Sequence, residues 1–430
     1  MQQTVRRAHA LRGTIVPPGD KSISHRAALF NAIARGEAVV ENFQRGADCL
    51  ATLRCLRRLG VSWSLDESSL RIKGAGRGGL REPEAVLDCR NSGTTMRLLS
   101  GLLAAQPFFS VLTGDASLRS RPMARVIDPL LKMGARIHGR DGDTKAPLAI
   151  RGAGLRGLHY RLPVASAQVK SALILAGLYA EGETTLEEPA PTRDHTERML
   201  QAMGASVTFG EGPAVTVRPL AAELSPLSLR VPGDISAAAP WLVLGALHPD
   251  AEIRIAGVSV NPTRTGILDA LAMMGADISI EEQRQWGPEP VADLVVRSSR
   301  LQGMVIGGDL VPRAIDELPL LALAGCLAQG ETLIKDASEL RLKESDRIRT
   351  TAAGLRRLGA RVDETPDGMR IAGGQALRGA TVSSYGDHRL AMMLAVAGGL
   401  ADGETVVHKS QSVAVSYPWF WSDLEALPPH

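Results

Sequence analysis

The sequence predicts an α/β (α+β) protein in which six βαβαββ repeat units are divided equally between two domains. One helix-like segment, polar at its start and rich in small apolar residues along its body, recurs six times at intervals of roughly 70 residues. A second segment, in which an apolar helix pattern runs into a glycine and then into strand-like residues, recurs five times. Such repetition is typical of one supersecondary unit copied along a chain.

The first predicted helix of each copy opens on polar residues. Its body reads HRAALFNAIARGEA in the first copy, for example, and LAMMLAVAGGLADGET in the sixth. The free backbone N–H groups and the positive end of the helix dipole lie at a helix start, which makes it a ready site for an anion. We therefore expect the six starts to converge on one pocket for a multiply charged anion. The openings are Lys21-Ser22, Asn91-Ser92-Gly93, Ser166-Ala167-Gln168, Asp234-Ile235-Ser236, Asp316-Glu317 and Asp387-His388-Arg389.

The second predicted helix of five copies ends at a glycine. A glycine just past an apolar helix pattern stops the helix, and the alternating residues after it indicate a strand. We interpret these segments as packing and capping elements. They span 56–63, 130–137, 200–207, 271–278 and 355–362. Strands such as GEAVVEN and GETVVHKS connect the two helices of a copy.

The sixth copy is shorter than the others, because the chain ends after VSYPWFWSDLEAL. Two strand-like segments, at 4–10 and 11–17, precede the first repeat helix. We expect these N-terminal segments to supply the strands that the sixth copy lacks, which would make one domain discontinuous.

The boundary between the two halves is indicated by an internal echo. The string VPPGDKSISHRAALFNAI near the start resembles VPGDISAAAPWLVLGAL, which begins at Val231. We expect one domain at 21–232 and a second made of 1–20 plus 233–430, with three copies in each. Both crossings between them would then fall at a Pro-Gly-Asp.

Composition limits the classes of function. The chain has 430 residues, 44% of them hydrophobic and 22% charged, and a net charge of +3. These values are typical of a folded soluble protein, and the absence of a basic run argues against a nucleic-acid binder. No window approaches the ~18 apolar residues of a membrane helix, so we expect no membrane association and a cytoplasmic location.

Cofactors and metals are not expected. The four cysteines are scattered and are expected to be reduced and buried, and the nine histidines show no close ligand spacing. Two G-x-G-x-x-G strings, at 74–79 and 152–157, follow strand-like segments but do not open a helix. The context of a dinucleotide site is therefore missing.

Charged residues at the ends of predicted elements are the candidates for chemistry, since loops beside a scaffold carry function. Asp316 opens a helix and has an alternative role as a plain N-cap, while Glu344 could simply pair with Arg347 at i,i+3. Among Lys and Arg, a carboxylate is held ionised and suits a base. His388 is a candidate acid or base; His195 could equally cap a helix. The cations in question are Lys21, Arg26, Arg97, Arg121, Arg193, Lys343, Arg347 and Arg389.

Seven strings along the whole chain resemble one family. They are PGDKSISHR, NSGTTMR, GDASLRSRPM, SAQVKSA, RDHTERM, RLKESDRI and GDHRLAM. In this order they are similar to the 3-phosphoshikimate 1-carboxyvinyltransferases, also called 5-enolpyruvylshikimate-3-phosphate (EPSP) synthases. The resemblance implies the two-domain enolpyruvyl transferase fold with an active site in the cleft between the domains. It also implies transfer of the enolpyruvyl group of phosphoenolpyruvate to the 5-hydroxyl of shikimate 3-phosphate, in the pathway to chorismate and the aromatic amino acids.

The resemblance assigns two sets of binding residues. Those for shikimate 3-phosphate would be Lys21, Ser22, Arg26, Ser166, Ala167, Gln168, Arg193, Asp316 and Lys343. Those for phosphoenolpyruvate would be Lys21, Gly93, Arg121, Gln168, Arg347 and Arg389. The guanidinium fork matches two oxygens of a carboxylate or phosphate, and a glycine lets a backbone N–H approach the ligand closely.

The implied reaction is addition followed by elimination through a tetrahedral intermediate. Asp316 would accept the proton of the 5-hydroxyl, and Lys21 and Glu344 are the candidates for proton transfer at the methylene carbon, with His388 as a further catalytic candidate. One departure from the family pattern is Val415, where a lysine is often found. Gly93 would leave room for the inhibitor glyphosate.

Two other functions remain open from the sequence. The related enolpyruvyl transferase acting on UDP-N-acetylglucosamine shares the repeat fold but carries a K-N start where this chain has Lys21-Ser22. A noncatalytic scaffold for phosphorylated ligands would keep the anion sites but would not need Asp316 or Glu344. Small anionic substrates are the expected partners, and we expect a monomer without nucleic acid.

Overall fold

The computed structural model describes residues 1–67 and 69–427, and the chain forms two compact units. Unit 1 comprises 1–18, 232–285 and 290–430, and unit 2 comprises 19–231 and 286–289. The two main crossings lie between Pro18 and Gly19 and between Val231 and Pro232, within two residues of the predicted positions. The sequence did not predict that 286–289 belongs to unit 2, where Glu289 Oε1 lies 2.7 Å from Nδ1 of His195 and both side chains are fully buried.

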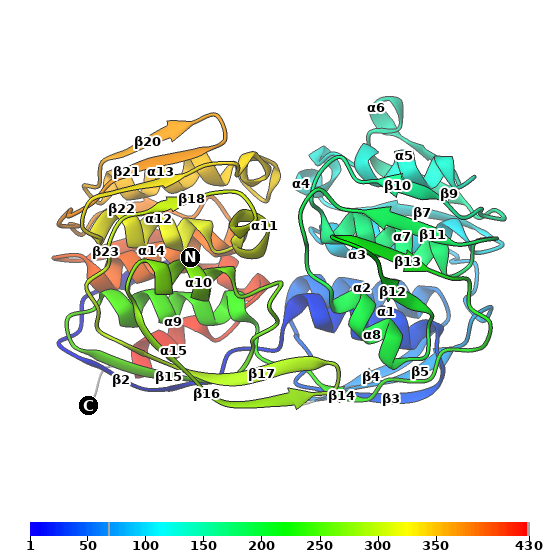
Figure 1. Cartoon of the computed structure of the whole chain (residues 1–430), viewed down its shortest axis with the longest axis horizontal. Coiled ribbons are helices and arrows are strands. Elements are labelled where there is room, and N and C mark those ends of the chain that lie inside the picture. The colour runs from blue at the N-terminus through cyan, green and yellow to red at the C-terminus, as the bar shows by residue number, and fades with distance from the viewer. Residues whose placement is uncertain (68, 428–430) are drawn as a thin grey trace. The chain divides into compact units, whose positions relative to one another are not determined.

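Unit 2 contains three repeat copies, each with a four-stranded sheet (Figure 1). The first copy consists of β14 (Leu229–Arg230), α1 (Lys21–Ile33), β3 (Arg35–Glu41), α2 (Ala47–Arg58), β4 (Ser62–Leu65) and β5 (Ser69–Ala75). The second consists of β6 (Leu87–Asp88), α3 (Gly93–Ala104), β7 (Phe109–Thr113), α4 (Ala116–Ser120), α5 (Ala124–Lys132), β8 (Arg136–Gly139), α6 (Arg140–Asp143) and β9 (Lys145–Arg151). The third consists of β10 (His159–Arg161), α7 (Ala167–Gly177), β11 (Thr184–Glu187), α8 (His195–Ala202), β12 (Val207–Phe209) and β13 (Ala214–Val217).

Unit 1 contains the other three copies. The fourth consists of β2 (Leu11–Ile15), α9 (Ile235–Leu247), β15 (Ala251–Ser259), α10 (Gly266–Met273), β16 (Asp277–Trp286) and β17 (Glu289–Arg297). The fifth consists of β18 (Val305–Ile306), α11 (Leu310–Ala314), α12 (Leu318–Leu327), β19 (Glu331–Ile334), η1 (Ser338–Leu342), α13 (Arg347–Arg357), β20 (Val362–Thr365) and β21 (Gly368–Ala372). The sixth consists of β22 (Thr381–Ser383), α14 (His388–Leu400), β23 (Thr405–His408), η2 (Ser410–Val415), α15 (Phe420–Ala426) and β1 (Gln2–Val5).

The sheets of the copies share one topology. The leading strand lies parallel to the strand after the first helix, and that strand lies antiparallel to the last one, as in the order β6-β7-β9-β8. The second helices end as predicted, because Gly60, Gly134, Gly204, Gly275 and Gly359 all adopt φ between 89° and 95°. This left-handed conformation suits glycine and ends a helix.

The N-terminus completes the sixth copy with one strand, not two. β1 pairs antiparallel with β23, from Gln2 opposite His408 to Val5 opposite Thr405. The expectation for the second segment was wrong, because β2 pairs parallel with β15 and is the leading strand of the fourth copy. The chain crosses between the units directly after β2, and β14, which precedes the other crossing, likewise leads the first copy. Each leading strand is therefore separated in sequence from its own copy: β2 comes just before the first copy but belongs to the fourth, and β14 comes just before the fourth but belongs to the first.

The first helices form the centre of each unit. All thirteen residues of α14 are buried, and α1, α3, α7, α9 and α12 are buried along most of their lengths. A helix that is apolar on every side belongs in a protein interior. The four cysteines are also buried and unbridged, as expected.

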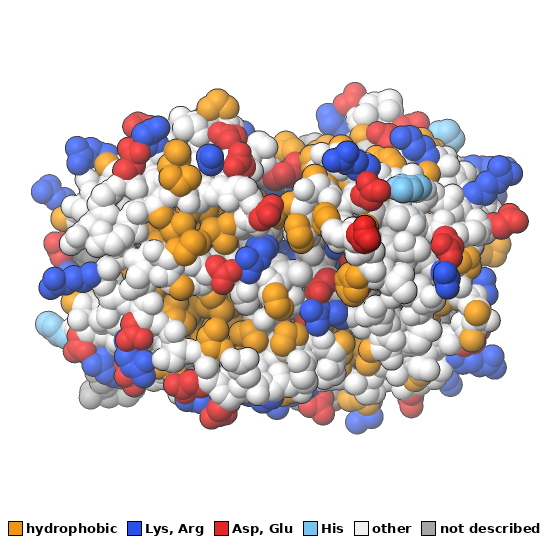
Figure 2. Space-filling model, in the orientation of Figure 1, with side chains coloured by type: hydrophobic (Ala, Val, Ile, Leu, Met, Phe, Trp, Pro, Cys, Tyr) orange, Lys and Arg blue, Asp and Glu red, His pale blue; other side chains and the backbone are white. Residues whose placement is uncertain are grey.

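The surface is mixed in charge. On the face drawn in Figure 2, acidic and basic side chains are interspersed over both units. Within residues 1–67 and 69–427, every helix is too short or too polar to span a lipid bilayer.

The contact between α3 and α7 generates a stability prediction. A Cβ on Gly101 of α3 would lie 2.0 Å from the carbonyl oxygen of Ala172 in α7, a backbone atom that cannot move aside. Gly101→Ala should therefore lower the free energy of unfolding by about 1–3 kcal/mol or more through overpacking. Gly78→Ala is the control, because nothing lies within 4 Å of its added Cβ. Equal urea midpoints for the two variants would contradict this packing.

Candidate active site

The start of α1 in unit 2 presents a paired lysine. Asp20 caps the helix by accepting from the backbone N–H of Ile23, and Lys21 follows as the first helical residue. Lys21 Nζ lies 3.2 Å from Oδ2 of Asp48 at the start of α2, and both side chains are mostly buried. Asp48, which the sequence reasoning missed, thus orients the lysine. The sequence around Asp48 does not reveal this role, because Lys21 lies 27 residues away.

Arg26 is held inside unit 2 by neutral partners. Its Nε donates to Thr196 Oγ1 at 2.7 Å, its Nη2 to Ser171 Oγ at 2.7 Å and its Nη1 to the carbonyl of Ser22 at 3.0 Å. Burial lowers the pKa of Arg26 to about 10; the charge of Glu197 opposes this change and that of Arg193 adds to it. The guanidinium joins α1, α7 and α8 while remaining cationic.

The starts of α3 and α7 bring four predicted or candidate residues together. Arg97 Nη1 donates to Gln168 Oε1 at 2.5 Å, and Gln168 Nε2 donates to Thr94 Oγ1 at 2.9 Å. A Cβ built on Gly93 would lie 2.6 Å from Arg97 Nη1 and 3.5 Å from Arg121 Nη1. Both guanidinium groups therefore lie beside the first residue of α3, where backbone N–H groups are free to bind an anion.

Arg121 reaches this place from the end of α4. Its Nη2 donates to Asn91 Oδ1 at 2.7 Å and lies 3.4 Å from Ser117 Oγ. Asn91 in turn donates to Asp115 at 2.7 Å, and Asp115 caps α4. Asn91 was recognised in the sequence only as part of a helix opening; its role in orienting Arg121 was not.

The remaining residues of the unit 2 set lie at the starts of α7 and α8. Ser166 caps α7, with its Oγ 3.5 Å from the N–H of Val169, and Ala167 is the first helical residue. Arg193 precedes α8, and its Nη1 lies 3.4 Å from Ser22 Oγ. Ser22 and Arg193, distant in sequence, are thus brought together.

A buried ion cluster anchors the segment that carries Arg193. Lys170 Nζ lies 2.7 Å from carboxylate oxygens of both Glu188 and Glu197. Burial acts to lower the pKa of Lys170, but the two carboxylates outweigh it and raise the pKa above its usual value. Thr192 also donates to Glu188, so both sides of Arg193 are fixed.

In unit 1, Arg347 gathers three carboxylates. It donates from Nη1 to Asp316 at 3.0 Å, from Nη2 to Glu344 at 2.6 Å and from Nε to Asp387 at 2.9 Å. The structure therefore unites the two predicted catalytic carboxylates. Asp316 precedes Glu317, the N-cap of α12, whereas Asp387 is the N-cap of α14. Glu344 does pair with Arg347 at i,i+3, as its alternative reading held, but as part of this larger cluster.

The cluster is strongly polarised. Arg347 is only 1% exposed, and burial alone would lower its pKa; the charges of Asp387, Glu344 and Asp316 instead raise the pKa of Arg347 above its usual value. One guanidinium thus faces three carboxylates, so the cluster has an excess of negative charge. Such a cluster can accept a proton from a hydroxyl group.

Arg389 offers donors that the protein does not use. It follows His388 at the start of α14, and both side chains are buried. Among the described residues, Nε and Nη1 of Arg389 have no hydrogen-bond partner. Buried donors are normally satisfied, so this guanidinium is suited to an anionic ligand. Lys343 is half-buried at the end of η1, four residues before Arg347.

Glu317 lies beside Asp316 and is fully buried. Its Oε1 accepts from Ser236 Oγ, and Ser236 accepts from Arg264 at 2.9 Å. Arg264 also donates to Asp234, the cap of α9, at 3.2 Å. Burial raises the pKa of Glu317; the charge of Arg264 opposes this and that of Asp316 adds to it. The start of α9, a predicted anion site, is therefore occupied by internal charges.

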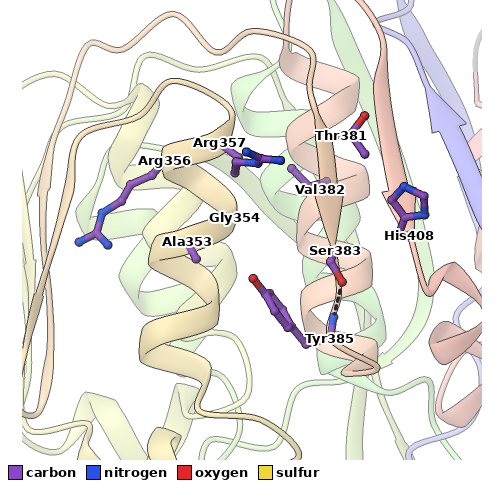
Figure 3. Close-up of a pocket in the computed structure, with 9 residues that line it drawn as sticks. All are labelled: Ala353, Gly354, Arg356, Arg357, Thr381, Val382, Ser383, Tyr385 and His408. Carbon is purple, nitrogen blue, oxygen red and sulfur yellow. Dashed lines mark hydrogen bonds between the residues drawn. The ribbon is translucent and has the colours of Figure 1, made fainter.

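A separate pocket of about 550 Å³ lies in unit 1 between α13 and the strands β22 and β23 (Figure 3). Its walls are formed by Ala353, Gly354, Arg356, Arg357, Thr381, Val382, Ser383, Tyr385 and His408. None of these belongs to the predicted site, and Tyr385 lies three residues before His388. The residues predicted to bind substrate or transfer protons therefore lie outside this pocket.

Two further expectations concern Val415 and metals. Val415 is half-buried at the end of η2, and Lys409, the nearby lysine, is exposed before its start. Across the described part of the chain, no group of three or more His, Cys, Asp or Glu side chains could hold a metal ion.

Six repeat copies whose first helices have polar starts, with cations at several of them and a carboxylate cluster around Arg347, are typical of the enolpyruvyl transferase class of group-transfer enzymes. The model of one family, EPSP synthase (3-phosphoshikimate 1-carboxyvinyltransferase), matches residues 5–424. The chain belongs to the EPSP synthase family.

Individual relatives agree along the full length. The chain is 58% identical over 420 residues to a 3-phosphoshikimate 1-carboxyvinyltransferase of Roseiflexus castenholzii, with 97% of each chain covered. It is 55% identical over 422 residues to that of Herpetosiphon aurantiacus, with 98% of each covered. A solved EPSP synthase structure from Acinetobacter baumannii has a TM-score of 0.88 at 43% identity, covering 100% of this chain and 98% of that one. The predicted family and fold class are confirmed.

The buried carboxyl of Glu317 generates a pH prediction. Because its folded pKa is raised, protonated Glu317 contributes stability below its unfolded pKa, and this contribution is lost as pH rises. Glu317→Gln keeps a group that can bond Ser236 but does not titrate. The free energy of unfolding of Glu317→Gln minus that of the wild type should therefore increase as the pH rises from the ordinary pKa of a glutamate toward the raised folded pKa of Glu317. Urea unfolding at several pH values measures this difference. A difference that stays constant with pH for Glu317→Gln would contradict the assignment.

Proposed function

We propose that this chain transfers the enolpyruvyl group of phosphoenolpyruvate to the 5-hydroxyl of shikimate 3-phosphate and releases inorganic phosphate. The family match across residues 5–424 carries the proposal. Cations at helix starts in both units suit two substrates that each bear a carboxylate and a phosphate.

Unit 2 contributes most of the cationic binding groups. Lys21, Ser22, Arg26, Ser166, Ala167, Gln168 and Arg193 are proposed to hold shikimate 3-phosphate, together with Asp316 and Lys343 of unit 1. Lys21, Gly93, Arg121 and Gln168 are proposed to hold phosphoenolpyruvate, together with Arg347 and Arg389 of unit 1. The placement of Arg121 beside Gly93 and the unused donors of Arg389 support the second set.

The proposed reaction proceeds by addition and elimination. Asp316 accepts the proton of the 5-hydroxyl while that oxygen bonds to C2 of phosphoenolpyruvate and C3 gains a proton. The tetrahedral intermediate then loses a proton from C3 and breaks the bond between C2 and the phosphate oxygen. Lys21, Glu344 and His388 are the candidates for proton transfer at C3. The excess of carboxylates around Arg347 supports a base in unit 1.

We further propose that the enzyme acts as a cytoplasmic monomer without cofactor or metal, and that small anionic substrates are its only required partners. Light scattering of the purified protein tests the monomeric state, and activity after dialysis against a chelator tests the independence from metal. A dimer, or activity lost to the chelator and restored by a metal ion, would overturn them.

The function is tested by phosphate release with phosphoenolpyruvate as donor. We expect release with shikimate 3-phosphate as acceptor and none with UDP-N-acetylglucosamine. Release only with the sugar nucleotide would assign the chain to the other transferase. Binding of the ligands without any release would indicate a noncatalytic scaffold.

Removal of the proposed base generates a kinetic prediction. Asp316→Asn keeps an oxygen that can accept from Arg347 but removes the basic carboxylate. Turnover should fall by about 10²–10⁴-fold, the usual contribution of general acid–base catalysis, and the affinity for shikimate 3-phosphate measured by calorimetry should fall far less than turnover. Asp309→Asn, an exposed aspartate of the same unit, is the control. Unchanged turnover of Asp316→Asn would remove Asp316 from the mechanism.

A further inference from the structure

Four buried side chains in unit 2 form a hydrogen-bonded chain across three helices. Nδ1 of His25 in α1 lies 2.7 Å from Thr52 Oγ1 in α2, and Thr52 Oγ1 lies 2.7 Å from Thr95 Oγ1 in α3. Thr95 donates to Ser92 Oγ at 2.7 Å. All four residues have 0% exposure. Of the four, only Ser92 was singled out from the sequence, as part of a predicted helix start.

The number of protons sets the direction of this chain. The single hydroxyl hydrogen of Thr95 points toward Ser92 Oγ and, at longer range, the carbonyl of Asp48, so Thr52 donates to Thr95 and His25 donates to Thr52 through Nδ1–H. His25 is then the neutral tautomer with its proton on Nδ1. Burial first, and then the charges of Lys21 and Arg26, hold the pKa of His25 well below its usual value, which agrees with a neutral ring.

The chain ends at the group that organises the start of α3. Ser92 Oγ is the N-cap acceptor for the backbone N–H of Thr95 at 3.1 Å, and it also receives the Thr95 hydroxyl. Ser92 lies between Asn91, which binds Arg121, and Gly93. The position of Ser92 therefore affects both the N–H groups at the helix start and the guanidinium beside them.

The same chain joins α3 to the lysine of α1. Thr52 lies one turn after Asp48 on α2, and Asp48 holds Lys21 through its carboxylate. The Thr95 hydroxyl lies 3.4 Å from the carbonyl of Asp48. Lys21 and Gly93 are thus fixed through one set of buried polar contacts, although they lie on different helices.

We infer that His25, Thr52 and Thr95 are positioning residues that align the start of α3 with Lys21 for binding of phosphoenolpyruvate. This inference rests on the proposed function, which places Lys21, Gly93 and Arg121 at that substrate. The three residues act through the helix starts and do not themselves contact the substrate. Hydrogen bonds between buried hydroxyl groups fix the relative positions of the helices more specifically than apolar packing does.

Thr95→Val tests the inference, because valine keeps the shape of threonine and removes the hydroxyl. We expect KM for phosphoenolpyruvate to rise by about tenfold, as for loss of a buried hydrogen-bonding group. KM for shikimate 3-phosphate should change less than twofold, since none of its proposed groups lies on α3. Thr95→Ser keeps the hydroxyl and should restore KM for phosphoenolpyruvate. If Thr95→Val does not fold, Thr52→Val and Thr52→Ser provide the same comparison.

Two further variants separate the possible explanations. Thr184→Val is the matched control, because Thr184 is fully buried in unit 2 and its Oγ1 has no hydrogen-bond partner among the described residues. Gly93→Ala tests the proposed site directly and should raise KM for phosphoenolpyruvate. Thr95→Val and Gly93→Ala combined should raise it by less than the product of the two single effects, because both act on one helix start.

The outcomes distinguish the inference from the function on which it rests. A tenfold, serine-restored rise in KM for phosphoenolpyruvate, coupled to Gly93→Ala, supports the inference. Lower stability with an unchanged KM, or an equal rise in both KM values, overturns it and leaves the proposed function standing. An unchanged KM in Gly93→Ala overturns the proposed phosphoenolpyruvate site itself, and the inference with it.

Discussion

The architecture depends on the burial of helices that are apolar on every side. Once α1, α3 and α7 fill the centre of one unit and α9, α12 and α14 that of the other, the polar groups on their sides need partners inside the unit, as Asn31 and Lys170 have. The first turns of these helices differ from their sides, because the backbone N–H groups there have no partner within the helix and must find one elsewhere. The polar openings of the six copies answer this requirement, and five of the six contain residues proposed to bind substrate. The exception is the start of α9, where Arg264 and Glu317 occupy the position.

The two units treat buried arginines differently. Arg26 is held by hydroxyls and a carbonyl, and burial lowers its pKa although the charge of Glu197 opposes this change. Arg347 is held by three carboxylates, so its pKa rises and the cluster is negative overall. The first arrangement suits the binding of phosphate and carboxylate groups, and the second suits the acceptance of a proton. The two units thus differ in the charges that surround their buried arginines, although they share one repeat topology.

The sequence predicted the features that depend on local pattern. The glycines that end the second helices and the polar starts of the first helices are visible in single segments, and the structure shows them at the expected positions. The strand partner of β2, the role of Asp48 and the gathering of carboxylates by Arg347 were not predictable. Each depends on which distant segment lies opposite, and a short motif contains no such information. Thr52 and Thr95 are still harder to recognise, because a buried threonine on a helix has no distinguishing neighbours in sequence.

The pairing of β1 with β23 has a consequence for the order of events during synthesis. Gln2 lies opposite His408, so β1 leaves the ribosome long before its partner β23 has been made. Residues 19–231 can meanwhile collapse around their own core, because β14 completes the sheet of the first copy from within that stretch. Contacts of such long sequence separation form slowly, and unpaired strand edges favour aggregation. We therefore expect the edges of unit 1 to stay unpaired for longer during synthesis than those of unit 2.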